Sequence, residues 1–478
     1  MRHILSVFLL AVLILFSGAR SSEIKLLSKQ EMYADFDQLV ATLKKVSPHL
    51  VCKKIAWQYN IDSLFTQFRT EIDTISSQRS FHELISKTTI ACQDGHTVLL
   101  SGYDYPPGYW GSLFIPLRYL NGEYVVTRNF NFEAIQVPAG SIVSKAMNKP
   151  VHDYVQTLTP YRYFMHYDMK NNRFYYNHFY QNNTINSSTE ITLDFITPDN
   201  KPITLQLKAS RRVNVEEITA NLSDTKKVEY WPEERILYIR IPVMEYNDRK
   251  YYRSQIPSVG KGKKIDRVLI DIRSNLGGSD LVWRTVYEQL LDKPAEWNSI
   301  LIGQDPSYMS SKYRKQKSIL PNSVNEQFDW LSGAVFSRYF DGTEKITPAK
   351  NSLRVSGKIV LLSNEDVYSS AGSCHKLSLS DPADRFVLIG RPTGMYLGAG
   401  FDPLSFRLKH SGYNFKIEPA IDITGAKDAI DVMQDRVEIK IPETLEELRT
   451  KFAYSGNVWS YDYLTKYDPF VKTALALK

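Results

Sequence analysis

The sequence predicts a mixed α/β protein with a helical N-terminal part, a β-rich middle and a C-terminal α/β core. Apolar residues recur at helical spacing between residues 24 and 100, and short alternating runs follow from 105 to 212. From residue 231 onward, apolar runs of strand length alternate with helical stretches. Strands that are apolar on both faces, with helices between them, indicate a sheet covered by helices.

Residues 1–22 have the pattern of a signal peptide. A short basic start, Arg2-His3, precedes an unbroken apolar run over residues 4–16, and the small residues 17–19 follow it. A spanning helix needs about 20 apolar residues, whereas a signal peptide needs an apolar run of roughly 7–15. We therefore expect an exported protein, periplasmic or extracellular, without stable membrane insertion after cleavage. An uncleaved membrane anchor is the alternative.

Residues 23–104 are predicted to form a helical subdomain. A first helix is expected over 31–46, where apolar residues lie on one stripe, and further helices begin near 61 and near 80. The third helix leads into Asp94-Gly-His-Thr97, which places a histidine in a polar turn.

The remaining chain divides by its patterning. Short strands separated by Pro, Gly and Asn predict a β-rich module over 105–212, and the polar stretch 213–230 is expected to be a linker. Residues 231–478 are predicted to form the α/β core. Its buried strands are expected at residues 236–241, 267–272, 358–362 and 386–389.

Charge and cysteine content exclude several classes of function. The net charge of +7 comes from 59 Lys and Arg against 52 Asp and Glu, without a basic tract, so we expect no nucleic-acid partner. The three cysteines, Cys52, Cys92 and Cys374, form no disulfide framework, although a single Cys52–Cys92 bridge stays open. There is no CxxC, HExxH or calcium-loop spacing, so we expect no metal and no cofactor.

Three turns carry residues suited to chemistry. Asp271-Ile-Arg-Ser-Asn-Leu-Gly-Gly278 follows a buried strand, and its glycines allow backbone N–H groups to approach a ligand. Ser369-Ser-Ala-Gly372 opens a helix, where an N–H can stabilise an oxyanion. His96 is a natural general base at neutral pH. Each has a plain structural reading, as a turn, a helix cap or a structural histidine. Together they supply a nucleophile, a base and oxyanion donors.

In this order, Asp94-Gly-His, Asp271 to Gly278, Ser370-Ala-Gly and Ile389-Gly-Arg-Pro-Thr-Gly394 resemble the motifs of the C-terminal-processing and tricorn-core serine peptidases. The resemblance extends over nearly the whole mature chain. It implies a crotonase-like βαβ-spiral catalytic core and a PDZ-like module at 105–212.

The resemblance also implies roles for individual residues. One branch of the family uses a Ser/Lys dyad, but Thr393 to Gly400 contains no Lys. The tricorn-like branch uses a histidine, so the resemblance implies Ser370 as nucleophile and His96 as general base. Ser369 is the alternative nucleophile if the turn is shifted by one residue.

The remaining site residues follow from the same resemblance. It implies oxyanion donors from the backbone of Gly277 or Gly278 and of Ala371. A late acidic residue would orient His96; Asp428 matches by spacing, and Asp431 is a rival.

Two positions depart from the family pattern. Ser373 and Arg391 stand where the family usually has glutamates. The expected function is an exported serine peptidase that hydrolyses unstructured or C-terminal polypeptide segments. The alternative is a catalytically inactive peptide- or lipid-binding member of the same scaffold.

Overall fold

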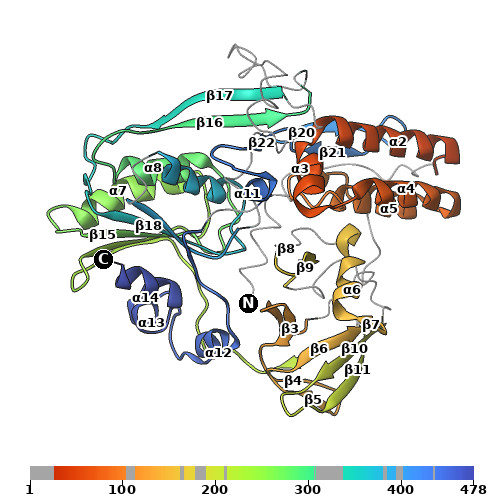
Figure 1. The fold of residues 1–478 in the computed structure, drawn as a ribbon, viewed down its shortest axis with the longest axis horizontal. Coiled ribbons are helices and arrows are strands. Elements are labelled where there is room, and N and C mark those ends of the chain that lie inside the picture. The colour runs from red at the N-terminus through yellow and green to blue at the C-terminus, as the bar shows by residue number, and fades with distance from the viewer. Residues whose placement is uncertain are drawn as a thin grey trace.

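The computed structural model describes residues 26–103, 114–161, 166–177, 190–208, 213–305, 307, 337–380, 385–393, 402–433 and 437–477. The predicted signal peptide, residues 1–22, lies outside the described residues. So does most of the stretch from Thr393 to Gly400, in which the Ser/Lys branch of the family would carry its lysine. Figure 1 shows a helical unit in red, a β-rich unit in orange and yellow, and a core in green to blue. The mixed α/β class predicted from the sequence is confirmed.

The helical unit is built by amphipathic helices, as the apolar spacing predicts. Its helices are α2 (Lys29–Val46), α3 (Pro48–Trp57), α4 (Ile61–Glu71) and α5 (Gln78–Ile90). A capping box between Ser28 and Glu31 starts α2, satisfying backbone donors that the first turn cannot pair internally. The buried faces meet in one hydrophobic cluster that includes Phe36, Phe65 and Phe81.

A hairpin from the C-terminal half of the chain completes this helical unit. It consists of β20 (Leu404–Arg407) and β21 (Asn414–Ile417), and β21 pairs antiparallel with β1 (Val98–Leu99). Phe415 and Ile417 are buried in the same cluster as the helices. The sequence analysis did not predict this pairing. Glu418 directly follows β21, so the pairing fixes where Glu418 lies.

The β-rich unit contains two sheets around a second hydrophobic cluster. The larger has the order β11-β10-β6-β3-β2, and the smaller has the order β12-β4-β5. The strands are β2 (Leu117–Leu120), β3 (Glu123–Val126), β4 (Phe130–Phe132), β5 (Ile135–Val137), β6 (Ile142–Ala146), β10 (Glu190–Ile196), β11 (Pro202–Lys208) and β12 (Asn214–Val215). A short helix, α6 (Val151–Gln156), and the hairpin of β8 (His166–Asp168) with β9 (Arg173–Tyr175) lie between them in sequence.

The core is a six-stranded sheet of order β13-β14-β15-β18-β19-β23. Every pair from β14 to β23 is parallel, and β13 is antiparallel to β14. The strands are β13 (Lys227–Trp231), β14 (Ile236–Arg240), β15 (Arg267–Asp271), β18 (Lys358–Ser363), β19 (Phe386–Gly390) and β23 (Ile439–Lys440). All four strands predicted from apolar runs are present. The expected linker instead contributes β12 to the β-rich unit and β13 to the core.

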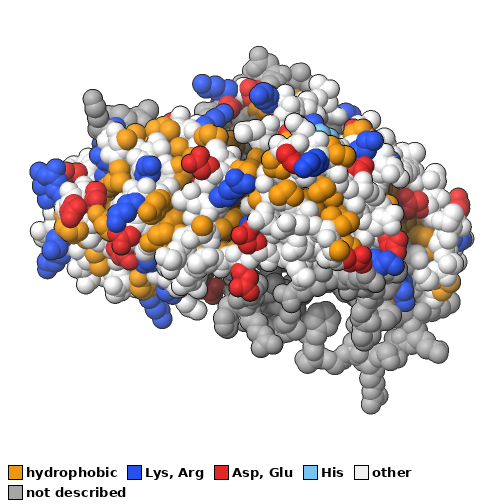
Figure 2. All heavy atoms as spheres, turned by 90° about the horizontal axis from the view of Figure 1, so that it is seen from below, with side chains coloured by type: hydrophobic (Ala, Val, Ile, Leu, Met, Phe, Trp, Pro, Cys, Tyr) orange, Lys and Arg blue, Asp and Glu red, His pale blue; other side chains and the backbone are white. Residues whose placement is uncertain are grey.

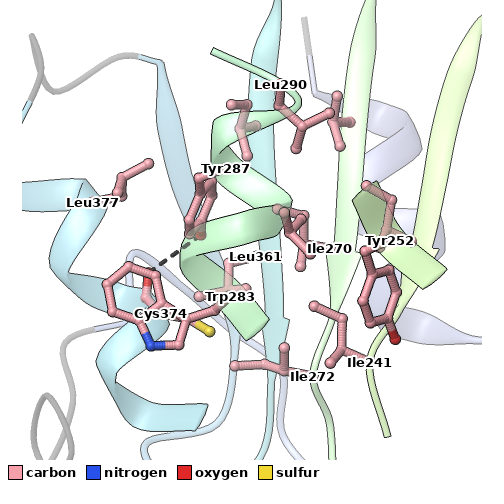
Figure 3. Packing of buried hydrophobic residues seen from close by; sticks show 14 of the residues in the cluster. Ile241, Tyr252, Ile270, Ile272, Trp283, Tyr287, Leu290, Leu361, Cys374 and Leu377 are labelled. Carbon is pink, nitrogen blue, oxygen red and sulfur yellow. Dashed lines mark hydrogen bonds between the residues drawn. The ribbon is translucent and has the colours of Figure 1, made fainter. Parts of the chain in front are cut away.

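Helices cover both faces of this sheet. On one face, α7 (Asp248–Gly260) and α8 (Asp280–Glu288) pack on the strands, with Trp283 and Tyr287 directed toward the segment that carries Cys374 (Figure 3). The Tyr287 hydroxyl donates a hydrogen bond of 3.2 Å to the Cys374 carbonyl. On the other face lie α13 (Tyr461–Lys466) and α14 (Pro469–Ala476), whose Phe470 joins a separate cluster. Burying each large apolar side chain contributes roughly 1.5–3 kcal/mol.

A smaller sheet of β16 (Ala295–Gly303), β17 (Ser337–Ile346) and β22 (Ile421–Asp422) runs beside the helical unit (Figure 1). Two further helices, α11 (Ala429–Met433) and α12 (Leu445–Ala453), follow in the C-terminal part. The three cysteines are buried free thiols, so the Cys52–Cys92 bridge left open by the sequence is not formed.

Within the described ranges, no helix combines the length and apolar character needed to cross a bilayer. Figure 2 shows one face on which acidic and basic side chains are interspersed with apolar ones.

Candidate active site

The segment after β18 presents Ser369 in an unusual backbone conformation. Ser369 has φ = +56°, in the left-handed region that non-glycine residues seldom adopt, and it opens the 3₁₀ helix η6 (Ser369–Leu379). The preceding amide, that of Tyr368, donates to the Asn275 carbonyl at 3.0 Å. Such a strained residue at the start of a helix is typical of functional sites. The side chain of Ser369 is partly exposed.

His96 reaches this serine from the helical unit. Its Nε2 lies 3.1 Å from Ser369 Oγ, within hydrogen-bond distance, although the two residues are separated by 273 positions. The histidine stands in the polar turn after α5, where the sequence predicts a catalytic base. The imidazole and the hydroxyl are therefore in the geometry that a Ser/His pair requires.

Asp94 and Tyr368 hold the two turns together. The Asp94 carboxylate accepts from the His96 amide at 3.0 Å and from the Thr97 hydroxyl at 2.6 Å. The Tyr368 hydroxyl donates to the same carboxylate at 3.3 Å and accepts from the Gly95 amide at 3.0 Å. Tyr368 directly precedes Ser369, so these bonds fix the turn of the base against the turn of the serine.

A buried carboxylate lies on the other side of the imidazole. Glu418 Oε2 is 3.4 Å from His96 Nδ1, and the Glu418 side chain is fully buried. The His96 Nδ1 atom makes no hydrogen bond within the described part of the chain. Because a neutral imidazole carries no charge, the contact with Glu418 becomes an ion pair only when the ring is protonated. Catalytic contacts of this kind are often long in the absence of substrate.

The environment keeps the His96 imidazole neutral near pH 7. Burial lowers the pKa of His96, and the negative charge of Asp94 offsets only part of that effect. A neutral imidazole can accept a proton from a serine hydroxyl.

The glycine pair after β15 packs directly against the serine. Gly277 and Gly278 have φ values of +101° and +135°. A Cβ atom on Gly277 would lie 2.7 Å from the Ser369 Cβ, and one on Gly278 would clash with the Met244 carbonyl. Only glycine fits both positions. The Asn275 side chain fixes the loop by accepting from the Gly277 amide at 2.8 Å.

Of the four backbone amides beside Ser369, two are already hydrogen-bonded and, within the described ranges, two are not. The Gly277 amide is bonded to Asn275, and the Ala371 amide donates to the Tyr368 carbonyl at 3.2 Å. By contrast, the N–H groups of Gly278 and Ser370 have no acceptor among the residues that the structure describes. These two amides flank the contact between the glycine pair and the serine turn.

The His96 ring contacts a serine and a carboxylate other than the two chosen from the sequence. The serine in contact with His96 is Ser369, whereas the Ser370 side chain is 6% exposed and its hydroxyl has no hydrogen-bond partner in the described ranges. The carboxylate beside His96 is Glu418. Asp428 is exposed and caps the start of α11, where its Oδ1 accepts from the Asp431 amide at 2.8 Å.

The departures from the family pattern have structural explanations. Arg391 donates to the Glu447 carboxylate at 3.0 Å and to the Ile441 carbonyl at 3.0 Å, so it links β19 to the C-terminal segment. Ser373 is buried within η6. Among the described residues, no group of His, Cys, Asp and Glu is arranged to hold a metal ion.

Comparison with known proteins identifies the core. Residues 235–427 match the model of peptidase family S41. This segment belongs to peptidase family S41. It contains Gly277, Gly278, Ser369 and Glu418, whereas His96 lies outside it. The match confirms the resemblance found in the sequence for residues 235–427, and it indicates a serine-type hydrolase that acts on polypeptides.

Two solved structures of mature CPAF support the fold. Mature CPAF complexed with lactacystin aligns with a TM-score of 0.59 at 13% identity, over 94% of this chain and 98% of that chain. A second structure of mature CPAF aligns with a TM-score of 0.58, also at 13% identity and over the same shares. The photosystem II D1 C-terminal processing protease aligns at 0.39 and 15% identity, over 90% of this chain and 99% of that chain. No curated protein sequence matches the chain.

Proposed function

We propose that this S41 protein is an exported serine peptidase in which Ser369 is the nucleophile, His96 the general base and Glu418 the residue that orients the base. The observation that carries the proposal is the 3.1 Å contact between His96 Nε2 and Ser369 Oγ. Ser369 takes the place of Ser370 in this assignment, and Glu418 takes the place of Asp428. The Ser370 amide takes the place of the Ala371 amide as an oxyanion donor. Export and cleavage of residues 1–22 rest on the sequence pattern alone.

The proposed reaction follows from these positions. Ser369 Oγ attacks the carbonyl carbon of a peptide bond while its proton passes to His96 Nε2. The N–H groups of Gly278 and Ser370 donate to the oxygen that becomes negatively charged. The protonated imidazole, stabilised by Glu418, then gives its proton to the leaving amine, and an acyl-enzyme remains. A water molecule, deprotonated by His96, hydrolyses the ester and restores Ser369.

The expected substrate is an unstructured or C-terminal polypeptide segment. A peptide must reach the partly exposed Ser369 in an extended form, because folded backbone is already hydrogen-bonded within its own elements. The β-rich unit offers strands β2 and β11 at the two ends of its larger sheet. A PDZ-like role for this unit would add the peptide to such an edge as a further strand.

Covalent labelling with a fluorophosphonate probe tests the proposal directly. The wild type should be labelled at a single peptide, with the adduct assigned to Ser369 by tandem mass spectrometry. Ser369→Ala should abolish labelling, whereas the matched variant Ser370→Ala should keep it. Absence of labelling in the wild type would favour the inactive peptide- or lipid-binding alternative, and an adduct on Ser370 would reject the assignment of Ser369.

A further inference from the structure

A cavity lies where the β-rich unit, the core loops and the C-terminal helices meet. Its volume is about 250 Å³. The β-rich unit contributes residues 114–118 and 127–128, the core contributes Arg273 and Asn364, and the C-terminal segment contributes residues from 443 to 470. His96, Ser369 and Glu418 do not line it, so it is separate from the proposed catalytic site.

The cavity is lined by charged side chains of both signs. Four carboxylates face five cationic groups. The carboxylates belong to Asp366, Glu443, Glu447 and Asp468, and the cations belong to Arg118, Arg128, Arg273, Arg391 and Lys451. Buried charges are normally paired, because an unpaired charge loses its hydration without compensation.

Three of the arginines are paired with carboxylates. Arg118 bonds to Glu365 at 2.6 Å, and Arg273 bonds to Asp468 at 2.6 Å. Arg391 bonds to Glu447 at 3.0 Å. These three cations are therefore neutralised within the protein.

Lys451 and Arg128 are not neutralised in this way. Lys451, on α12, is partly buried, and its Nζ has no hydrogen bond or ion pair within the described ranges. Arg128 donates through Nη1 to the Glu216 carbonyl at 2.7 Å, but its buried Nε has no hydrogen-bond partner there. Burial lowers the pKa of Lys451, and the nearby charge of Arg273 adds to the effect. An anion between the two groups would supply the missing partner for both.

The rest of the wall is apolar and aromatic. Phe114 and Phe452 line the cavity and lie 5.9 Å and 5.3 Å from the Arg128 guanidinium. Ile115, Leu448 and Trp459 add further apolar surface. A ligand that fits must therefore combine one negative charge with an apolar body.

We propose that this cavity binds a small apolar monocarboxylate, with its carboxylate between Lys451 Nζ and Arg128 Nε and its apolar part against Phe452 and Leu448. The carboxylates of Asp366, Glu443, Glu447 and Asp468 line the same cavity and repel a dianion such as phosphate more strongly than a monoanion. The volume is large enough for several water molecules or a small organic acid. The same chemistry is found in a free acid and at the carboxyl end of a peptide with an apolar last residue.

Isothermal titration calorimetry on the full-length Ser369→Ala chain tests this site without turnover. The probes are 3-phenylpropionate with its amide, N-acetyl-alanyl-phenylalanine with its C-terminal amide, and inorganic phosphate at matched ionic strength. We expect saturable 1:1 binding of at least one acid, and at least tenfold weaker binding of its amide and of phosphate. Preference for the free acid or for the peptide acid identifies the source of the carboxylate.

Matched variants locate the binding site. Lys451→Met should weaken binding at least tenfold, whereas Lys472→Met, which changes an exposed lysine on α14, should leave it unchanged. The proposal is overturned if neither acid binds saturably, if the amides or phosphate bind equally well, or if folded Lys451→Met binds like its parent. The comparison of acid with amide needs no variant at Lys451. The titration also does not depend on the chemistry of Ser369, so failure here and failure of fluorophosphonate labelling are independent results.

Discussion

The two halves of the proposed catalytic site are built in different ways. The serine and the glycine pair stand on loops that follow β18 and β15, which are adjacent parallel strands with Asp271 opposite Leu362. Their positions are fixed by one sheet and its hydrophobic cluster. His96 and Glu418 instead belong to the helical unit, whose separate cluster is completed by the β20–β21 hairpin.

This difference indicates which half is the more easily displaced. The carboxyl ends of adjacent parallel strands meet at one edge of a sheet, so the serine and the glycine pair cannot separate without breaking the core. The base and its carboxylate meet the serine through a few side-chain contacts, chiefly His96 with Ser369 and Tyr368 with the Asp94 turn. Changes in the first half should therefore alter the chemistry, and changes in the second should alter alignment as well.

The largest expected effect on catalysis comes from the half of the site that the core sheet carries, which contains Ser369 and the glycine pair; we call it the sheet-borne half. Ser369→Ala should lower kcat/KM for an unfolded polypeptide substrate by about 10⁶-fold, as loss of a nucleophile does in other serine peptidases. Ser370→Ala should stay close to wild type, because it removes a hydroxyl without a hydrogen-bond partner among the described residues and keeps the backbone N–H. Steady-state kinetics of the two variants, with circular dichroism to confirm folding, measure this contrast. Equal losses would mean that the turn is placed differently.

The next effect is in the base-bearing half. Glu418→Gln should lower kcat/KM by roughly 10⁴-fold, because the carboxylate would no longer stabilise the imidazolium or fix the ring. Asp428→Asn is the matched control, since this exposed carboxylate caps α11. The same kinetic assay compares them. If only Asp428→Asn lowered kcat/KM, Asp428 and not Glu418 would be the residue that orients His96.

The sequence predicted the sheet-borne half better than the other. The apolar runs at 236, 267, 358 and 386 identified the core strands, and the Gly277-Gly278 pair could be recognised because both residues need backbone conformations that only glycine tolerates. The choice between Ser369 and Ser370 could not be made in the same way. It depends on one dihedral angle, the φ of +56° at Ser369, which no residue type at this turn specifies.

Glu418 was missed for a different reason. Its position depends on β21 pairing with β1, a contact between residues more than 300 positions apart. The stretch around it was not recognised as strand, although Asn414-Phe-Lys-Ile417 alternates polar and apolar residues. That alternation, followed by a glutamate, was the available signal. His96 was identified because a histidine in a polar turn after a helix stands out locally.

The pH dependence of catalysis tests the state of the base. Activity requires neutral His96, so kcat/KM should rise with pH through the pKa of His96 and level off above it. Because burial lowers this pKa, the acid limb should lie below the ordinary value of about 6.5, with a tenfold fall per pH unit beneath it. A pH–rate profile measures the limb. A midpoint above 6.5 would contradict a desolvated imidazole in the free enzyme.

Acid should also destabilise the helical unit through His49. Burial lowers the pKa of His49 to about 4, with Asp94, Lys53 and His96 nearby. The unfolded chain binds this proton below about pH 6.5 and the folded one only near pH 4, so stability is lost as pH falls across that window. His49→Leu should reduce the slope of the unfolding free energy by about 1.4 kcal/mol per pH unit. Urea unfolding of the wild type and of His49→Leu at several pH values measures the change in slope.

The smallest expected effect is at the contact between the two halves. Tyr368→Phe removes the hydroxyl that donates to Asp94 and accepts from the Gly95 amide, while the ring can still pack 5.1 Å from the His96 ring. We expect a loss of roughly 1–3 kcal/mol in unfolding free energy, because buried partners are left without a hydrogen bond. The kcat should fall by about tenfold if alignment of the base with Ser369 limits the rate, since one such hydrogen bond is worth about 1.4 kcal/mol.

Tyr413→Phe, which removes a hydroxyl bonded to Gln78 elsewhere in the helical unit, is the control. If both variants lose stability but neither loses kcat, the two halves are held together by packing of the helical unit, and the Tyr368 hydroxyl only stabilises the fold.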